Sequence, residues 1–87
     1  PSYFGYSTNC LVHISHHPSM AASLLPSVYP FPSSLMAKGE TILGMAVSPS
    51  NSNVLLFTPF SVFVFHASRA KWTVAQSLFS VLLLEFQ

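Results

Sequence analysis

Residues 54–66 read VLLFTPFSVFVFH, and this stretch decides the fold class. Residues 54–57 and 60–66 are rich in β-branched and aromatic side chains, which favour strands, and Pro59 interrupts the run between them. The second run is apolar on both faces, which is typical of a strand that is buried on both sides or faces a membrane. We therefore predict strands near 54–57 and 60–66.

The flanking segments extend this pattern in both directions. Residues 48–53 read SPSNSN, a strong turn signal, and residues 41–47 read TILGMAV, which favours a third strand. Apolar residues recur at helical spacing after the last strand, namely Trp72, Ala75, Phe79, Leu82 and Phe86. We expect short antiparallel strands near 41–47, 54–57 and 60–66 and an amphipathic helix near 70–86. A fourth strand through residues 81–84 is the competing interpretation.

The first third of the chain differs from the rest in composition. Residues 1–37 contain five of the seven prolines, and proline removes an amide donor and interrupts regular structure. Residues 11–16 form the one strand-like run, residues 19–25 favour a short helical turn, and residues 27–32 favour an extended chain. We predict an irregular Pro/Ser-rich segment over 1–37 and a small hydrophobic module over 38–87. The predicted fold class is mixed α+β, leaning to β.

The charge content excludes some functions and favours others. Only 6% of the 87 residues are charged, against about 25% in ordinary soluble domains, and the formal net charge is +1. Nucleic-acid binding needs clustered basic residues, which are absent, so we exclude it. A chain with so few charges must bury its apolar surface against something else.

We therefore predict a non-catalytic structural or accessory chain that is ordered by packing in a larger protein assembly. Its aromatic residues exceed what a small core hides, and such a surplus is typical of interfaces. The predicted interface consists of Phe57, Phe60, Phe63, Phe65, Trp72, Phe79, Leu82 and Phe86.

Two alternatives stay open. The first is a membrane-surface protein. The uncharged apolar block 54–67 has 14 residues, which is too few for a membrane-spanning helix of about 20 residues. An interfacial or re-entrant hairpin would instead place Arg69, Lys71 and Trp72 among the lipid headgroups. The second is a chain without a selected function, from an arbitrary reading frame or an uncertain sequence assignment. Phe, Ser, Leu and Pro, which are read largely from pyrimidine-rich codons, make up 41 of the 87 residues.

One group of residues has metal-ligand chemistry. Cys10, His13, His16 and His17 combine a thiol with imidazoles in a Cys-x-x-His-x-x-His pattern, which suits zinc or copper. Structural zinc sites usually draw ligands from two separated segments, and only His66 lies elsewhere in the chain. The four residues are the candidate metal site, and surface histidines are the competing interpretation.

Catalytic patterns are missing. The chain has no Asp, and its two carboxylates, Glu40 and Glu85, are remote in sequence from Cys10 and its neighbouring histidines. The three glycines are isolated, so no phosphate-binding loop is present. We predict that the protein is not an enzyme and has no catalytic residues, no cofactor and no small-molecule substrate. A single cysteine leaves the compartment unassigned.

Residues 42–72 resemble in pattern one blade of a WD-repeat propeller. The resemblance rests on a hydrophobic run that ends at Ser48-Pro49, a polar turn and two further hydrophobic runs. The Gly-His and Trp-Asp dipeptides of that family are missing, Phe65-His66 stands where Trp-Asp would be, and the pattern has no second copy in the chain. We therefore adopt no family from the sequence.

Overall fold

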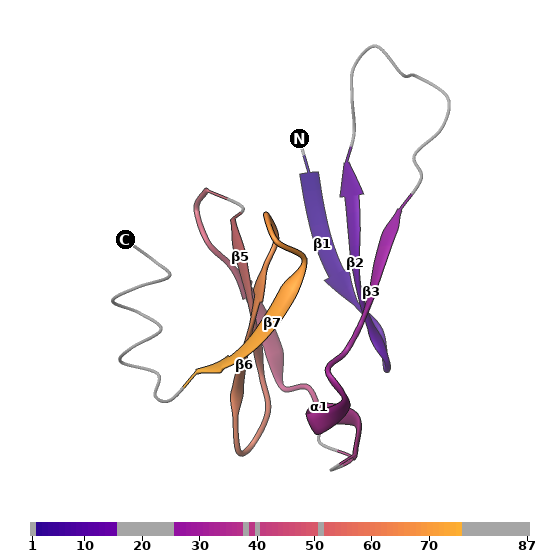
Figure 1. Cartoon of the computed structure of the whole chain (residues 1–87), viewed down its shortest axis with the longest axis vertical. Helices are drawn as coiled ribbons and strands as arrows, with labels where there is room; N and C mark the ends of the chain where they lie inside the picture. Colours follow the sequence, from indigo (N-terminus) through magenta and orange to yellow (C-terminus); the bar gives the residue numbers. More distant parts are fainter. Residues whose placement is uncertain (1, 16–25, 38, 40, 51, 76–87) are drawn as a thin grey trace. The chain divides into compact units, whose positions relative to one another are not determined.

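The computed structural model describes residues 2–15, 26–37, 39, 41–50 and 52–75. They form two compact units, Pro1–Ala37 (unit 1) and Lys38–Gln87 (unit 2), each with one antiparallel sheet (Figure 1). The elements are, in chain order, β1 (Ser2–Tyr6), β2 (Cys10–Ser15), β3 (Ser27–Pro30), α1 (Ser33–Ala37), β4 (Gly44–Val47), β5 (Asn53–Phe57), β6 (Val62–His66) and β7 (Lys71–Ala75).

Unit 1 contains a three-stranded sheet in the order β1-β2-β3, so the prediction of an irregular first third is wrong. The prolines of this region interrupt its strands less than expected because they fall at strand ends. Pro26 precedes β3, and Pro30 is the last residue of this edge strand, where a missing amide donor is tolerated. The short helix α1 follows Pro32, whose carbonyl oxygen accepts hydrogen bonds from the amides of Leu35 and Met36.

Unit 2 contains a four-stranded sheet in the order β4-β5-β6-β7, in which each strand pairs with the next one along the chain. The register places Val47, Val54, Phe65 and Trp72 in one row across the four strands. β4, β5 and β6 lie where the sequence predicted strands near 41–47, 54–57 and 60–66.

The predicted mixed α+β class is wrong, because the described residues are mostly strand and contain one helix of only five residues. The helix predicted over 70–86 is wrong at residues 71–75, which form β7. Trp72, Thr73 and Val74 are aromatic or β-branched and pair with β6 across a short turn, so local strand pairing prevails over the helical spacing. Residues 76–87, which hold the rest of that prediction and the alternative strand 81–84, lie outside the described residues, as do residues 19–25.

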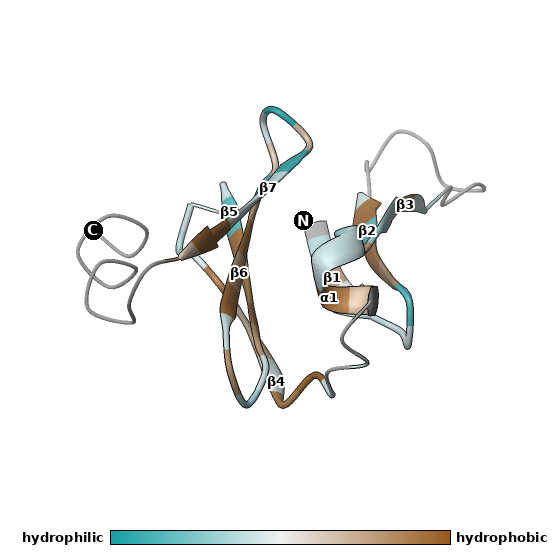
Figure 2. Cartoon of the chain, turned by 60° about the horizontal axis from the view of Figure 1, so that its bottom comes forward, coloured by the Kyte–Doolittle hydropathy of each residue, from teal (hydrophilic) through white to brown (hydrophobic). Residues whose placement is uncertain are grey.

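The core of unit 2 lies in its two central strands. Three consecutive residues of β5 and three of β6 are buried, namely Val54, Leu55, Leu56, Phe63, Val64 and Phe65. Because successive side chains of a strand point to opposite faces, both faces of these strands are buried. Figure 2 shows the hydrophobic character of β5 and β6 and the hydrophilic turn between β6 and β7.

Buried hydroxyl groups hold the two proline-containing turns of unit 2. In the β4–β5 turn, the Oγ of Ser48 accepts hydrogen bonds from the amides of Ser52 and Asn53, at 3.2 and 3.1 Å. In the β5–β6 turn, Thr58 Oγ1 has the same role for the amides of Phe60 and Ser61. Such side-chain acceptors pair turn amides that the strand ladder leaves free.

Candidate interaction surface

The register of unit 2 divides its side chains between two faces of different composition. One face, called here the apolar face, carries no polar side chain on any of the four strands. It consists of Met45, Val47, Val54, Leu56, Phe63, Phe65, Trp72 and Val74. An antiparallel sheet commonly alternates between an apolar and a polar face. A face that is apolar from edge strand to edge strand is therefore suited to packing against another apolar surface.

Burial on the apolar face decreases from the centre of the sheet toward β7. The residues of β5 and β6 on this face are buried, whereas Trp72 is half-buried and Val74 is 56% exposed. Trp72 packs on Phe65 with the ring centroids 4.9 Å apart and the ring planes tilted by 53°. This arrangement fixes the indole across β6 and β7 and leaves Val74 as the exposed apolar side chain of the strand.

The opposite face, called here the mixed face, changes character along the strands. Leu55 and Val64 form its buried centre, packed against Ala46, Phe57, Val62 and Ala75. At the end nearer the β6–β7 turn the side chains are polar, and His66 Nε2 lies 2.9 Å from Thr73 Oγ1. Lys71 is the partner of His66 in the register, and Arg69 lies in the adjoining turn. This end of the unit carries both of its described cations.

The predicted interface residues lie in different environments. Phe63 and Phe65 are buried on the apolar face, and Phe57 is half-buried on the mixed face. Phe60 is the exception among the described ones, since it lies in the β5–β6 turn and is 83% exposed. Phe79, Leu82 and Phe86 lie outside the described residues. The aromatic residues that the sequence grouped as one interface are thus divided between core and surface.

The structure describes two of the four predicted metal ligands, and it places them on opposite faces of β2. His13 stacks on Phe4 with a centroid distance of 4.2 Å and an interplanar angle of 11°. The Sγ of Cys10 lies 3.0 Å from the Oγ of Ser7, in the turn between β1 and β2. No group of three or more metal-ligating side chains occurs within the described ranges. His16 and His17 lie outside them, so the metal site stays a prediction.

The sequence analysis missed several features of the surface. Leu43 is 65% exposed just before β4, and Tyr3 and Val28 are also exposed in unit 1. It also missed the turn-holding role of Ser48 and Thr58. Each of these two residues precedes a proline, and a hydroxyl residue before proline is a signal for turn initiation that could have identified them.

No protein-family model, curated protein or solved structure matches the chain. The sheet of unit 2 has the strand number of a propeller blade, but the dipeptides typical of WD repeats are absent, and the resemblance is not adopted. Within the part of the chain that the structure describes, no helix has the length and apolar character of a membrane span.

Proposed function

We propose that the protein is a non-catalytic interaction module that is ordered by packing against a larger protein assembly. The observation that carries this proposal is the apolar face of unit 2, which continues without a polar side chain onto both edge strands. Protein interfaces bury apolar and aromatic side chains at their centre and are depleted of charge there. The low charge of the whole chain, 6%, supports the same role.

The edge strand β7 is the part of the apolar face that offers the most surface for contact. Val74 is exposed there, beside the half-buried Trp72. An exposed apolar edge is unfavourable in water and favours association with another chain. The contact we propose therefore includes β7. If the chain had no selected function, there would be no reason for eight apolar side chains to share one face of the sheet. Their common face therefore favours the interaction module over this alternative.

The proposal is tested by size-exclusion chromatography with multi-angle light scattering on the full chain expressed alone. We expect self-association, because no partner chain then covers the exposed Val74 at the β7 edge of the apolar face. Val74→Thr should shift the distribution toward smaller species. Thr73→Ser is the matched control: it is exposed on the mixed face of the same strand, keeps its hydroxyl and should change nothing. A chain that stays monomeric at every concentration, or a size distribution that Val74→Thr leaves unchanged, would contradict the proposal.

A further inference from the structure

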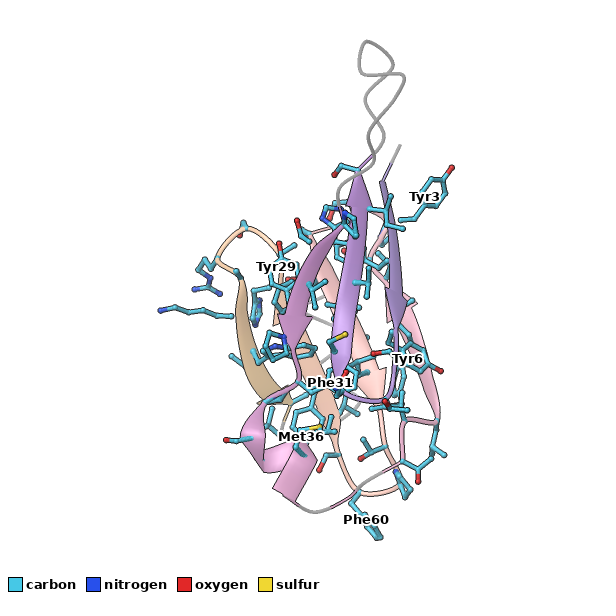
Figure 3. The ribbon with its side chains drawn as sticks, turned by 90° about the vertical axis from the view of Figure 1, so that its right-hand side faces the viewer. Tyr3, Tyr6, Tyr29, Phe31, Met36 and Phe60 are labelled. Atoms are coloured by element: carbon cyan, nitrogen blue, oxygen red, sulfur yellow. The ribbon has the colours of Figure 1, made fainter. Side chains whose placement is uncertain are left out.

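The two most exposed large hydrophobic side chains of the described residues lie at one end of the sheet of unit 2. Phe60 is 83% exposed and Leu43 is 65% exposed. The amide of Leu43 donates a hydrogen bond of 2.7 Å to the carbonyl oxygen of Phe57, which places Leu43 next to the β5–β6 turn, residues 58–61. Figure 3 shows Phe60 projecting from that turn. This turn together with Leu43 is called here the apolar tip.

The turn satisfies its own amide donors. The amide of Thr58 donates to the carbonyl oxygen of Ser61 at 3.0 Å. The amides of Phe60 and Ser61 donate to Thr58 Oγ1 at 3.3 and 3.0 Å, and Pro59 has no amide hydrogen. Each N–H group of the turn thus has an acceptor within the turn. An unpaired N–H group is costly in a hydrocarbon environment, so this turn can leave water without exposing a free backbone N–H group.

The apolar tip is also uncharged. Residues 41–43 and 57–61 contain no Asp, Glu, Lys or Arg, and the described cations of the unit, Arg69 and Lys71, lie at the opposite end of β6. At about 3.3 Å per residue, the five residues of β6 separate the two ends by roughly 17 Å. Association through the tip therefore does not depend on these charges. Association through the tip differs from the membrane-surface alternative predicted from the sequence, in which Arg69, Lys71 and Trp72 contact the membrane.

We propose that the apolar tip inserts into the apolar boundary of a lipid bilayer. A protein partner would need a pocket shaped for a protruding phenyl ring, whereas a bilayer accepts a protruding apolar side chain without a preformed cavity. Since one Phe and one Leu bury less apolar surface than a single acyl chain, the binding is weak and reversible. It does not require anionic lipid and persists at high salt, because apolar insertion drives it.

The test uses the full chain and phosphatidylcholine vesicles, with flotation to separate bound protein from self-associated protein. In the double variant Phe60→Trp, Trp72→Phe, the new indole should show a blue-shifted emission with vesicles and quenching by brominated lipid. Trp72 of the unaltered chain should show neither effect, because it lies toward the opposite end of the sheet. Phe60→Ser should lower the partition coefficient about tenfold.

Val28→Thr is the matched control, since it removes an exposed apolar side chain from β3 of unit 1, which is not part of the apolar tip. It should leave vesicle binding unchanged. Circular dichroism should show an intact fold for Phe60→Ser, because the ring is largely outside the core. Three results would overturn the proposal: absence of quenching at position 60, binding that Phe60→Ser does not weaken, or binding restricted to anionic vesicles and lost in high salt. Phe60-dependent binding to a protein but not to vesicles would also overturn it.

Discussion

The sheets of units 1 and 2 share an antiparallel, sequential strand order but bury their strands differently. In unit 2 the central strands β5 and β6 are buried on both faces over three consecutive residues each. In unit 1, Leu11 is the only buried residue among the described strand positions. Because hydrophobic stabilisation scales with buried apolar area, the two sheets draw their stability from different sources.

Unit 2 depends on the side chains of its two central strands. Unit 1 depends more on backbone pairing, on the stacking of Phe4 with His13, and on Phe31 and Leu35, which are buried outside its sheet. The chain carries a separate optical probe for each unit, because its one tryptophan, Trp72, belongs to unit 2 and its three tyrosines belong to unit 1. The comparison can therefore be tested one unit at a time.

The largest expected effect is in the core of unit 2. Leu56→Ala should lower the free energy of unfolding of this unit by about 2–5 kcal/mol, because a fully buried side chain is removed and the surrounding core cannot fully collapse. Urea unfolding followed by Trp72 fluorescence measures the change. Val74→Ala is the control on the same face, where the side chain is 56% exposed, and it should cost less than about 1 kcal/mol. Equal costs at the two positions would contradict the decrease in burial on the apolar face from β5 to β7.

A smaller effect is expected from the ring stack of unit 1. Phe4→Leu and His13→Leu, with the double variant, should give a coupling free energy of about 0.5–1.5 kcal/mol, as aromatic pairs do. Tyrosine fluorescence during urea unfolding reports on this unit. The control cycle uses Tyr3 and Ile14, which are directly opposed in the register on the other face of the sheet. If both cycles gave the same coupling, the stack would have no special part in holding unit 1.

The sequence predicted the strands of unit 2 better than those of unit 1 for a physical reason. Residues 54–57 and 62–65 are apolar and belong to strands that are buried on both faces at their centres, so composition alone indicated them. The strands of unit 1 contain mostly half-buried or exposed residues, and β1 and β3 are bordered by prolines, so composition does not indicate them in the same way. β7 was mistaken for a helix because Trp72 and Ala75 begin a series of apolar residues at three- and four-residue spacing, whereas the strand places these two residues on opposite faces of the sheet.

The candidate surface was predicted in composition but not in arrangement. The aromatic surplus pointed to an interface, yet only the register shows that Phe63, Phe65 and Trp72 share one face while Phe57 lies on the other. The exposure of Phe60 depends on the turn that Thr58 holds, which is a matter of hydrogen bonds between residues. Spacing in a single sequence does not specify such contacts.

The smallest expected effect is in the turn between β6 and β7. Ala70 has a positive φ of 51°, in the left-handed region that a Cβ atom disfavours. Ala70→Gly should therefore raise the stability of unit 2 by about 0.5–1 kcal/mol, with the gain reduced by the greater freedom of glycine in the unfolded chain. Trp72 fluorescence in urea measures it. Ala67→Gly, in the same turn but without a positive φ, supplies the control and should not stabilise. A gain at position 67 equal to that at position 70 would show that the benefit comes from a looser turn, and that strain at Ala70 does not limit the stability of unit 2.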